Sequence, residues 1–140
     1  MANPSDDVLR QIYLDAKVIV VVGASTDETK PSHIIPNYMK NQGYRVIPVS
    51  PKEGELFGET VIPSLEDVKA PIDIVDVFRP SQEAPEIAKQ AVAIRAKVLW
   101  LQSGIYSEEA EKIARDGGLE VAMDICLGAT HGRLGLGPGP

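Results

Sequence analysis

Five short apolar runs, separated by stretches with helical periodicity, constrain the fold of this chain more than any other feature of its sequence. The first run, Val-Ile-Val-Val-Val, is apolar at every position, which is typical of a strand buried on both faces of a parallel sheet. The runs cover residues 18–22, 45–49, 72–78, 98–101 and 119–123. Their alternation with helical segments predicts an α/β fold: a Rossmann-like, open, mostly parallel five-stranded sheet with helices on both faces.

The chain has the size of one such unit. Its 140 residues suit a single domain spanning residues 1–140. We expect a leading helix within residues 1–17, and an irregular tail over residues 132–140, where Gly and Pro are frequent. The longer connection over residues 52–69 is expected to contain a short helix that begins near Ser64.

The composition of the chain limits which classes of molecule it can bind and which cellular compartment suits it. The formal net charge is −6, and an acidic surface disfavours broad binding to nucleic acid or to an anionic membrane. No apolar run is long enough for a membrane span, and the polar N-terminus carries no secretory signal pattern. A single cysteine, Cys126, permits no internal disulfide. We therefore expect a cytoplasmic protein that binds a small molecule.

The first strand is followed by a glycine-containing turn and then by the start of a helix. Glycine lets the backbone turn sharply and approach a ligand closely, and a helix N-terminus offers free N–H groups and a positive dipole end. We predict a phosphate-binding site formed by Gly23, Ala24, Ser25, Thr26, Lys30 and Ser32. The alternative is a tight turn before a capped helix, because the full three-glycine dinucleotide fingerprint is absent.

The second strand is followed by Ser50, Pro51 and Lys52. An NAD-binding unit usually places an acidic residue here to hold the ribose hydroxyl. A lysine instead suits a ribose that carries an additional phosphate, as in NADP or coenzyme A. The alternative is a solvated loop lysine.

The third strand is followed by Phe78 and Arg79. The guanidinium of Arg79 can hold a phosphate through two parallel hydrogen bonds, and Phe78 can cover an adenine ring. The alternative places Phe78 in the core and pairs Arg79 with a surface carboxylate such as Glu83.

The fourth strand is followed by Gln102, Ser103 and Gly104. The two polar side chains can bond a polar ligand arm, and the glycine permits close approach. The alternative is an ordinary turn.

The sequence contains no convincing catalytic or metal centre. Cys126 and His131 form a conceivable nucleophile–base pair, but nothing indicates a thiolate of low pKa, and a buried, unreactive cysteine is the simpler interpretation. The two histidines lie far apart, and no Cys/His spacing is typical of zinc. Asp73 and Asp76, three residues apart in a strand, point to opposite faces. We therefore expect no metal and no catalysis.

Taken together, these segments resemble the small stand-alone CoA-binding proteins, which are similar to the nucleotide-binding module of the succinyl-CoA synthetase α subunit. The resemblance runs from about residue 18 to residue 126 and differs at Ser103, where Leu is frequent, and at Ile125, where Arg is frequent. It rests on the order of the segments 20–25, 30–32, 43–51, 75–81, 97–102 and 123–126, which read VVVGAS, KPS, GYRVIPVSP, VDVFRPS, KVLWLQ and MDIC.

The resemblance implies coenzyme A as the ligand, lying across the strand ends. It would place the phosphates at residues 23–26, the adenosine 3′-phosphate at residues 50–52, the adenine region at residues 78–79 and the pantetheine arm at residues 102–104. We therefore expect a protein that binds CoA or an acyl-CoA. The alternatives are an NADP-dependent oxidoreductase and a non-catalytic subunit of a CoA-ligase-like complex. A mixed disulfide between Cys126 and the CoA thiol is a further hypothesis.

Overall fold

The protein is described here by a computed structural model that covers residues 3–139. All neighbouring strands of the main sheet are parallel, and they lie in the order β2-β1-β5-β6-β7. The predicted Rossmann-like α/β fold is confirmed. The strands are β1 (Val18–Val22), β2 (Arg45–Val49), β5 (Ile74–Val77), β6 (Val98–Leu101) and β7 (Glu120–Ala122).

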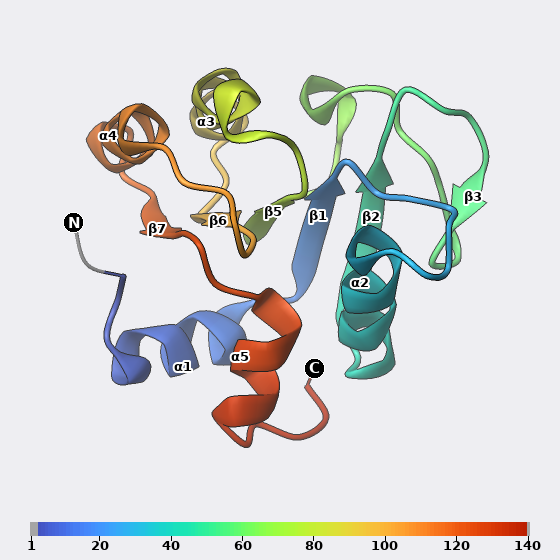
Figure 1. Cartoon of the computed structure of the whole chain (residues 1–140), viewed down its shortest axis with the longest axis horizontal. Coiled ribbons are helices and arrows are strands. Elements are labelled where there is room, and N and C mark those ends of the chain that lie inside the picture. The colour runs from blue at the N-terminus through green and yellow to red at the C-terminus, as the bar shows by residue number, and fades with distance from the viewer. Residues whose placement is uncertain (1–2, 140) are drawn as a thin grey trace.

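Helices cover both faces of this sheet, as Figure 1 shows. One face packs against α1 (Asp6–Asp15), α2 (Pro31–Asn41) and α5 (Leu127–Arg133). The other face packs against α3 (Ala84–Ala93), α4 (Glu108–Asp116) and the short 3₁₀ helix η1 (Leu65–Asp67). A second 3₁₀ turn, η2 (Ser81–Glu83), leads into α3.

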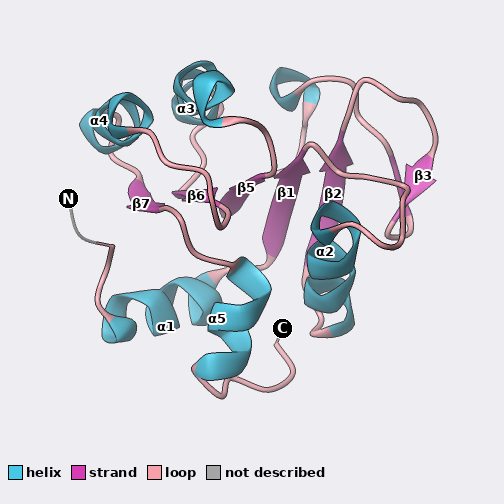
Figure 2. Cartoon of the chain, viewed as in Figure 1, coloured by secondary structure: helices cyan, strands magenta, loops and turns pink. Residues whose placement is uncertain are grey.

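The strand order decides where a ligand can lie. From β1 the chain passes to β2 on one side, and it then crosses over to β5 on the other side of β1. The connections after β1 and β5 therefore diverge, which opens a crevice at the carboxyl ends of these strands. In Figure 2 the loops that follow β1 and β2 lie beyond the arrow tips of these two strands.

The sheet is buried on both faces, as continuous apolar strands require. All residues of β5 and β6 are buried, and the indole of Trp100 donates a hydrogen bond to the Ile125 carbonyl at 2.9 Å. Asp76 is the exception in this core. It lies in register with Val21 and Trp100, and neither of its carboxyl oxygens has a hydrogen-bond partner within residues 3–139. Complete burial raises the pKa of Asp76 well above its ordinary value.

The connection after β2 holds one element that we predicted and one that we did not. The Ser64 hydroxyl caps η1 by accepting a hydrogen bond from the Glu66 N–H at 3.4 Å, so the short helix near Ser64 is confirmed. A small antiparallel hairpin of β3 (Glu55–Leu56) and β4 (Glu59–Thr60) precedes it. Two-residue strands are too short to show the alternation that predicts a strand.

Helix α5 was also not predicted from the sequence. It includes Gly132 and Arg133, so the predicted irregular tail over residues 132–140 is wrong at these two residues. Glycine disfavours a helix interior, so the local sequence conceals this element. Tertiary packing explains why glycine lies in this helix. Helix α5 packs closely on α2, since a Cβ at Gly128 would lie only 3.3 Å from the Ile35 side chain.

Candidate functional site

The turn after β1 can be made only with glycine. Gly23 has a φ of +91°, a conformation that side chains with a Cβ rarely adopt. A Cβ there would lie 2.8 Å from the Phe78 carbonyl oxygen and 2.9 Å from Cδ of Arg79. The Gly23 N–H also donates to the Val49 carbonyl at 3.0 Å. Gly23 therefore brings the loops after β1, β2 and β5 together at one edge of the sheet.

Beyond Gly23, the turn leaves backbone donors free. The Ser25 N–H is used, since it donates to the Ser32 carbonyl at 3.2 Å. The N–H groups of Ala24, Thr26 and Ser32 have no acceptor within residues 3–139. Ser32 lies in the first turn of α2, where the helix dipole is positive. Free N–H groups at a helix N-terminus are suited to an anion.

Two lysines flank this turn without a carboxylate partner. Lys30 is the N-cap residue of α2, and its side chain makes no capping hydrogen bond. Lys52 follows β2, and its N–H donates to the Ser50 hydroxyl at 3.2 Å. Within residues 3–139 neither ammonium group forms an ion pair. Both charges are therefore available to a ligand.

Arg79, in contrast, is already engaged. Its Nε donates to one carboxylate oxygen of Glu83 at 3.1 Å, and its Nη2 donates to the other at 2.7 Å. These hydrogen bonds, with the opposite charge of the partner, lower the pKa of Glu83 and raise the pKa of Arg79. The pairing that we weighed as the alternative for Arg79 is thus the one observed. Phe78 is half-buried and packs against the core on the α1 face.

These residues line one cavity of about 840 Å³ at the carboxyl end of the sheet. This volume lies within the range of small-molecule binding sites. The predicted residues that line it are Gly23, Ala24, Ser25, Thr26, Lys30, Ser32, Ser50, Pro51, Lys52, Phe78 and Arg79.

Further lining residues were not identified from the sequence. One wall comes from the hairpin and the η1 segment, and the opposite wall comes from η2 and α3. Helical periodicity could have indicated the second wall, because residues 83, 86, 87 and 90 share a helix face. The additional residues include Leu56, Val61, Pro63, Ser64, Leu65, Gln82, Glu83, Glu86, Ile87 and Gln90.

The residues predicted after the fourth strand do not line this cavity. Gln102 is buried, and its Oε1 accepts a hydrogen bond from the Leu127 N–H at 3.0 Å. The Gly104 N–H donates to the Asp124 carboxylate at 2.7 Å. Ser103 between them is exposed. Gln102 and Gly104 thus hold the loops that lead into α5.

Cys126 and His131 are engaged in separate contacts. The Cys126 sulfur caps α5 by accepting from the Ala129 N–H at 3.4 Å. His131 is buried, and its Nδ1 lies 2.9 Å from the Tyr38 hydroxyl. Burial lowers the pKa of His131, which favours the neutral ring. These contacts give no support to a nucleophile–base pair.

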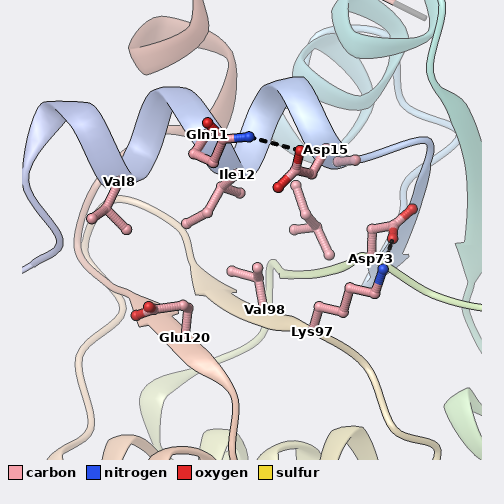
Figure 3. Close-up of a pocket in the computed structure, with 10 residues that line it drawn as sticks. Val8, Gln11, Ile12, Asp15, Asp73, Lys97, Val98 and Glu120 are labelled. Carbon is pink, nitrogen blue, oxygen red and sulfur yellow. Dashed lines mark hydrogen bonds and ion pairs between the residues drawn. The ribbon is translucent and has the colours of Figure 1, made fainter.

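A second, smaller cavity of about 260 Å³ lies at the amino end of the sheet, under α1. Its floor is apolar, and Figure 3 shows charged side chains around it. Asp73 carries most of the contacts there: one oxygen accepts from the Lys17 and Val18 N–H groups at 2.8 and 2.9 Å. Its other oxygen pairs with Lys97 at 3.4 Å. These contacts anchor the start of β1.

Within residues 3–139, no group of three or more His, Cys, Asp or Glu side chains is arranged to hold a metal ion. Across the same residues, no helix combines the length and the apolar character needed to cross a bilayer.

Comparison with known proteins identifies relatives along nearly the whole chain. The family described as CoA binding domain matches residues 17–132. The uncharacterized protein YneT of Bacillus subtilis is 37% identical over 131 residues, which cover 94% of this chain and 97% of YneT. The solved structure of cell-free ID.343 from Thermus thermophilus has a TM-score of 0.90 and 44% identity, and the match covers 94% of this chain and 99% of that one.

A more distant relative is a much longer protein. An ADP-forming acetate–CoA ligase of Methanocaldococcus jannaschii is 25% identical over 128 residues. The match covers 86% of this chain and only 18% of the ligase. The chain therefore corresponds to a small part of that enzyme.

Proposed function

The chain belongs to the CoA binding domain family, and on this premise we propose that it binds coenzyme A or an acyl-CoA in the cavity at the carboxyl end of the sheet. The observation that carries the proposal is the group of unused anion-binding elements around this cavity. The cavity is lined by Lys30 and Lys52 and by the residues whose N–H groups lack an acceptor, Ala24, Thr26 and Ser32; none of these groups has a partner within residues 3–139. A ligand with several phosphates would engage them together.

We assign parts of the ligand to these elements by their chemistry. The turn at residues 23–26 would hold the diphosphate, because it combines free N–H groups with the N-terminus of α2. Lys52 would hold the ribose 3′-phosphate, since a cation after the second strand suits a phosphorylated ribose. Arg79 can contribute only if a phosphate competes with the Glu83 carboxylate.

We further propose that this chain acts by binding and has no catalysis of its own. The ionisable side chains that line the cavity are Lys30, Lys52, Arg79, Glu83 and Glu86. Of these, Arg79 and Glu83 are occupied with each other. General acid–base catalysis needs a group whose pKa is matched to its task, and none of the five is a histidine or a cysteine. In this proposal the chain presents or stores the ligand.

Titration calorimetry with three ligands tests the proposal. We expect saturable binding of CoA, weaker binding of CoA that lacks its 3′-phosphate, and no competition by NADPH. Absence of heat with either form of CoA would refute the proposed function. Equal affinity for both forms would remove the role of Lys52, and tight NADPH binding without CoA competition would favour an oxidoreductase.

A second candidate is a CoA-binding subunit that works with a separate catalytic partner. It is favoured by the likeness of this chain to a short part of an acetate–CoA ligase. Co-purification of a tagged chain, followed by a CoA ligase assay on the purified fraction, tests it. Ligase activity that the isolated chain lacks would support this candidate, whereas an inactive fraction would count against it.

A further inference from the structure

We propose that His33 is a positioning residue: it orients the peptide between Ser25 and Thr26 so that the Thr26 N–H faces the anionic part of the ligand. His33 does not line the cavity, although the turn it contacts does. The proposal rests on the proposed function, since the anion is taken to be the CoA diphosphate. In this proposal a side chain outside the phosphate-binding turn sets the orientation of an N–H group within the turn.

The first observation is a short contact from the ring to the turn. Nδ1 of His33 lies 2.8 Å from the Ser25 carbonyl oxygen. A carbonyl oxygen can only accept, so Nδ1 must carry the hydrogen. His33 itself is fixed in the first turn of α2, where its N–H bonds to the Lys30 carbonyl at 2.9 Å.

The geometry of the peptide bond supplies the next step. The peptides of residues 3–139 include no cis bond, and in a trans peptide the carbonyl and the N–H point in opposite directions. The carbonyl of Ser25 points to His33, which lies outside the cavity. The N–H of Thr26 therefore points away from His33, and because Thr26 lines the cavity, we infer that this N–H faces the ligand. It has no acceptor within the described residues.

The same imidazole ring contacts the β3–β4 hairpin, whose Leu56 lines the cavity. Its centroid lies 5.3 Å from that of the Phe57 ring, with 50° between the planes. Phe57 and Gly58 form the two-residue turn of the β3–β4 hairpin, with φ angles of +56° and +76°. Such a turn suits a hairpin, but a left-handed phenylalanine is strained. Phe57 is buried to 8% exposure, and the His33 ring is one of its contacts.

His33 is thus placed between two parts of the site. On one side it fixes a donor of the phosphate-binding turn, and on the other it supports the hairpin whose Leu56 lines the cavity. The hydrogen bond and the ring contact use different properties of the side chain. They can therefore be removed one at a time.

Two substitutions separate these contributions. His33→Asn keeps a short amide donor for the Ser25 carbonyl and loses the ring, whereas His33→Phe keeps a ring and loses the donor. Ile34→Ala serves as the matched control, because Ile34 is the next residue of α2 and is 51% exposed. Circular dichroism and thermal unfolding establish that each variant is folded.

The measurements are calorimetric affinity for CoA and the ¹H–¹⁵N resonance of the Thr26 amide. In the wild type we expect this resonance to move downfield on adding CoA. His33→Phe should lose that shift and bind CoA about tenfold more weakly, the factor that one hydrogen bond to a charged group supplies. His33→Asn should keep the shift and stay within about threefold of the wild type. Ile34→Ala should match the wild type.

Two results would overturn the proposal: wild-type affinity in His33→Phe, or equal losses in His33→Phe and His33→Asn. Equal losses would mean that the ring acts only as packing. If the wild type does not bind CoA, the proposed function fails, and titration with inorganic pyrophosphate then decides the role of His33. A Thr26 shift that is present in the wild type and in His33→Asn but absent in His33→Phe would support it, and any other pattern would not.

Discussion

The two ends of the sheet both carry a cavity, yet the cavities differ in size and in how their charges are used. At the carboxyl end, a cavity of about 840 Å³ is bordered by Lys30, Lys52 and backbone N–H groups that have no partner in the described part of the chain. At the amino end, about 260 Å³ is bordered by side chains that are already partnered. There Asp73 bonds two backbone N–H groups and Lys97, and Asp15 accepts from Gln11.

The difference follows from the direction of parallel strands. Strands β1, β5, β6 and β7 each lead from their carboxyl end toward a helix N-terminus, so positive helix ends gather at that edge. The amino edge receives the C-terminal ends of helices, which do not favour an anion. The carboxyl end is therefore suited to phosphate, while the amino end serves to anchor the strands. Pairs of matched substitutions can test this division.

The largest effect on stability is expected when two glycines at opposite ends of the sheet, which have the same φ, are replaced by alanine. Gly23 and Gly118 both have a φ of +91°, but only Gly23 has atoms within 3 Å of a Cβ position, and Gly118 has none within 4 Å. Gly23→Ala should lower the free energy of unfolding by about 2–4 kcal/mol and weaken CoA binding. Gly118→Ala should cost about 1 kcal/mol from strain alone. Urea denaturation and calorimetry measure both, and equal costs would contradict the close packing at Gly23.

The next largest effect on stability comes from replacing two aspartates that lie three residues apart in the sequence. Asp73 is bonded at the amino end, so Asp73→Ala should destabilise the fold by about 1–3 kcal/mol. Asp76 is buried and has no hydrogen-bond partner among residues 3–139, so Asp76→Val should stabilise the fold by about 1–3 kcal/mol at pH 7. Chemical denaturation of both variants measures these opposite signs.

The pH dependence of the Asp76 effect has a defined direction. Burial raises the pKa of Asp76 in the folded state, so the protonated form is the one that favours folding. That contribution is fully present below the unfolded pKa of about 3.9 and is lost as the pH rises through the folded pKa. The stability gap between Asp76→Val and the wild type should therefore shrink from pH 7 toward pH 4. A gap that does not change with pH would contradict a buried, titrating carboxyl group.

A smaller effect is expected from one lysine at each end. Lys52→Met removes an unpaired cation from the carboxyl end and should weaken CoA binding about tenfold. It should leave the affinity for CoA without its 3′-phosphate unchanged. Lys97→Met removes a cation that is paired with Asp73 at the amino end and should change neither affinity. Calorimetry at low ionic strength is the appropriate measurement, because salt screens exposed charges.

The smallest effect concerns one ion pair at each end. Glu83→Gln should free Arg79 for a phosphate and raise the CoA affinity by about two- to threefold, since an exposed ion pair is worth less than about 1 kcal/mol. Glu120, which pairs with Arg115 at the amino end at 3.6 Å, provides the control. Glu120→Gln should leave the affinity unchanged. Weaker binding in Glu83→Gln would show that Glu83 itself contacts the ligand.

The main elements could be predicted because their signals lie within a few neighbouring residues. The run at residues 18–22 marks β1 through its composition alone. Serine is a residue type that favours the start of a helix, and the Ser107 hydroxyl accepts from the Ala110 N–H at 3.0 Å at the start of α4. Helix α5 and the β3–β4 hairpin were missed for local reasons, namely the glycines of α5 and the two-residue strands of the hairpin.

The candidate site was predictable to the extent that it follows strand ends. Parallel strands bring their carboxyl ends to one edge, so the residues after β1, β2 and β5 were expected to meet there, and they do. Gln102 follows β6 by the same rule, but its side chain turns into the protein and bonds the start of α5. Because α5 was not predicted, this use of Gln102 could not be foreseen.

The sequence by itself determined the alternation of strands and helices, the need for glycine at position 23 and the basic residues after the strands. These features depend on backbone conformation and charge, which each short segment carries with it. The tertiary structure decided between the two uses predicted for Arg79 in favour of the Glu83 pair. It alone showed that Asp76 has no hydrogen-bond partner within residues 3–139 and that His33 contacts the Ser25 carbonyl. Such contacts depend on how segments distant in the chain, or separate turns of one loop, pack against each other, and no local pattern records that packing.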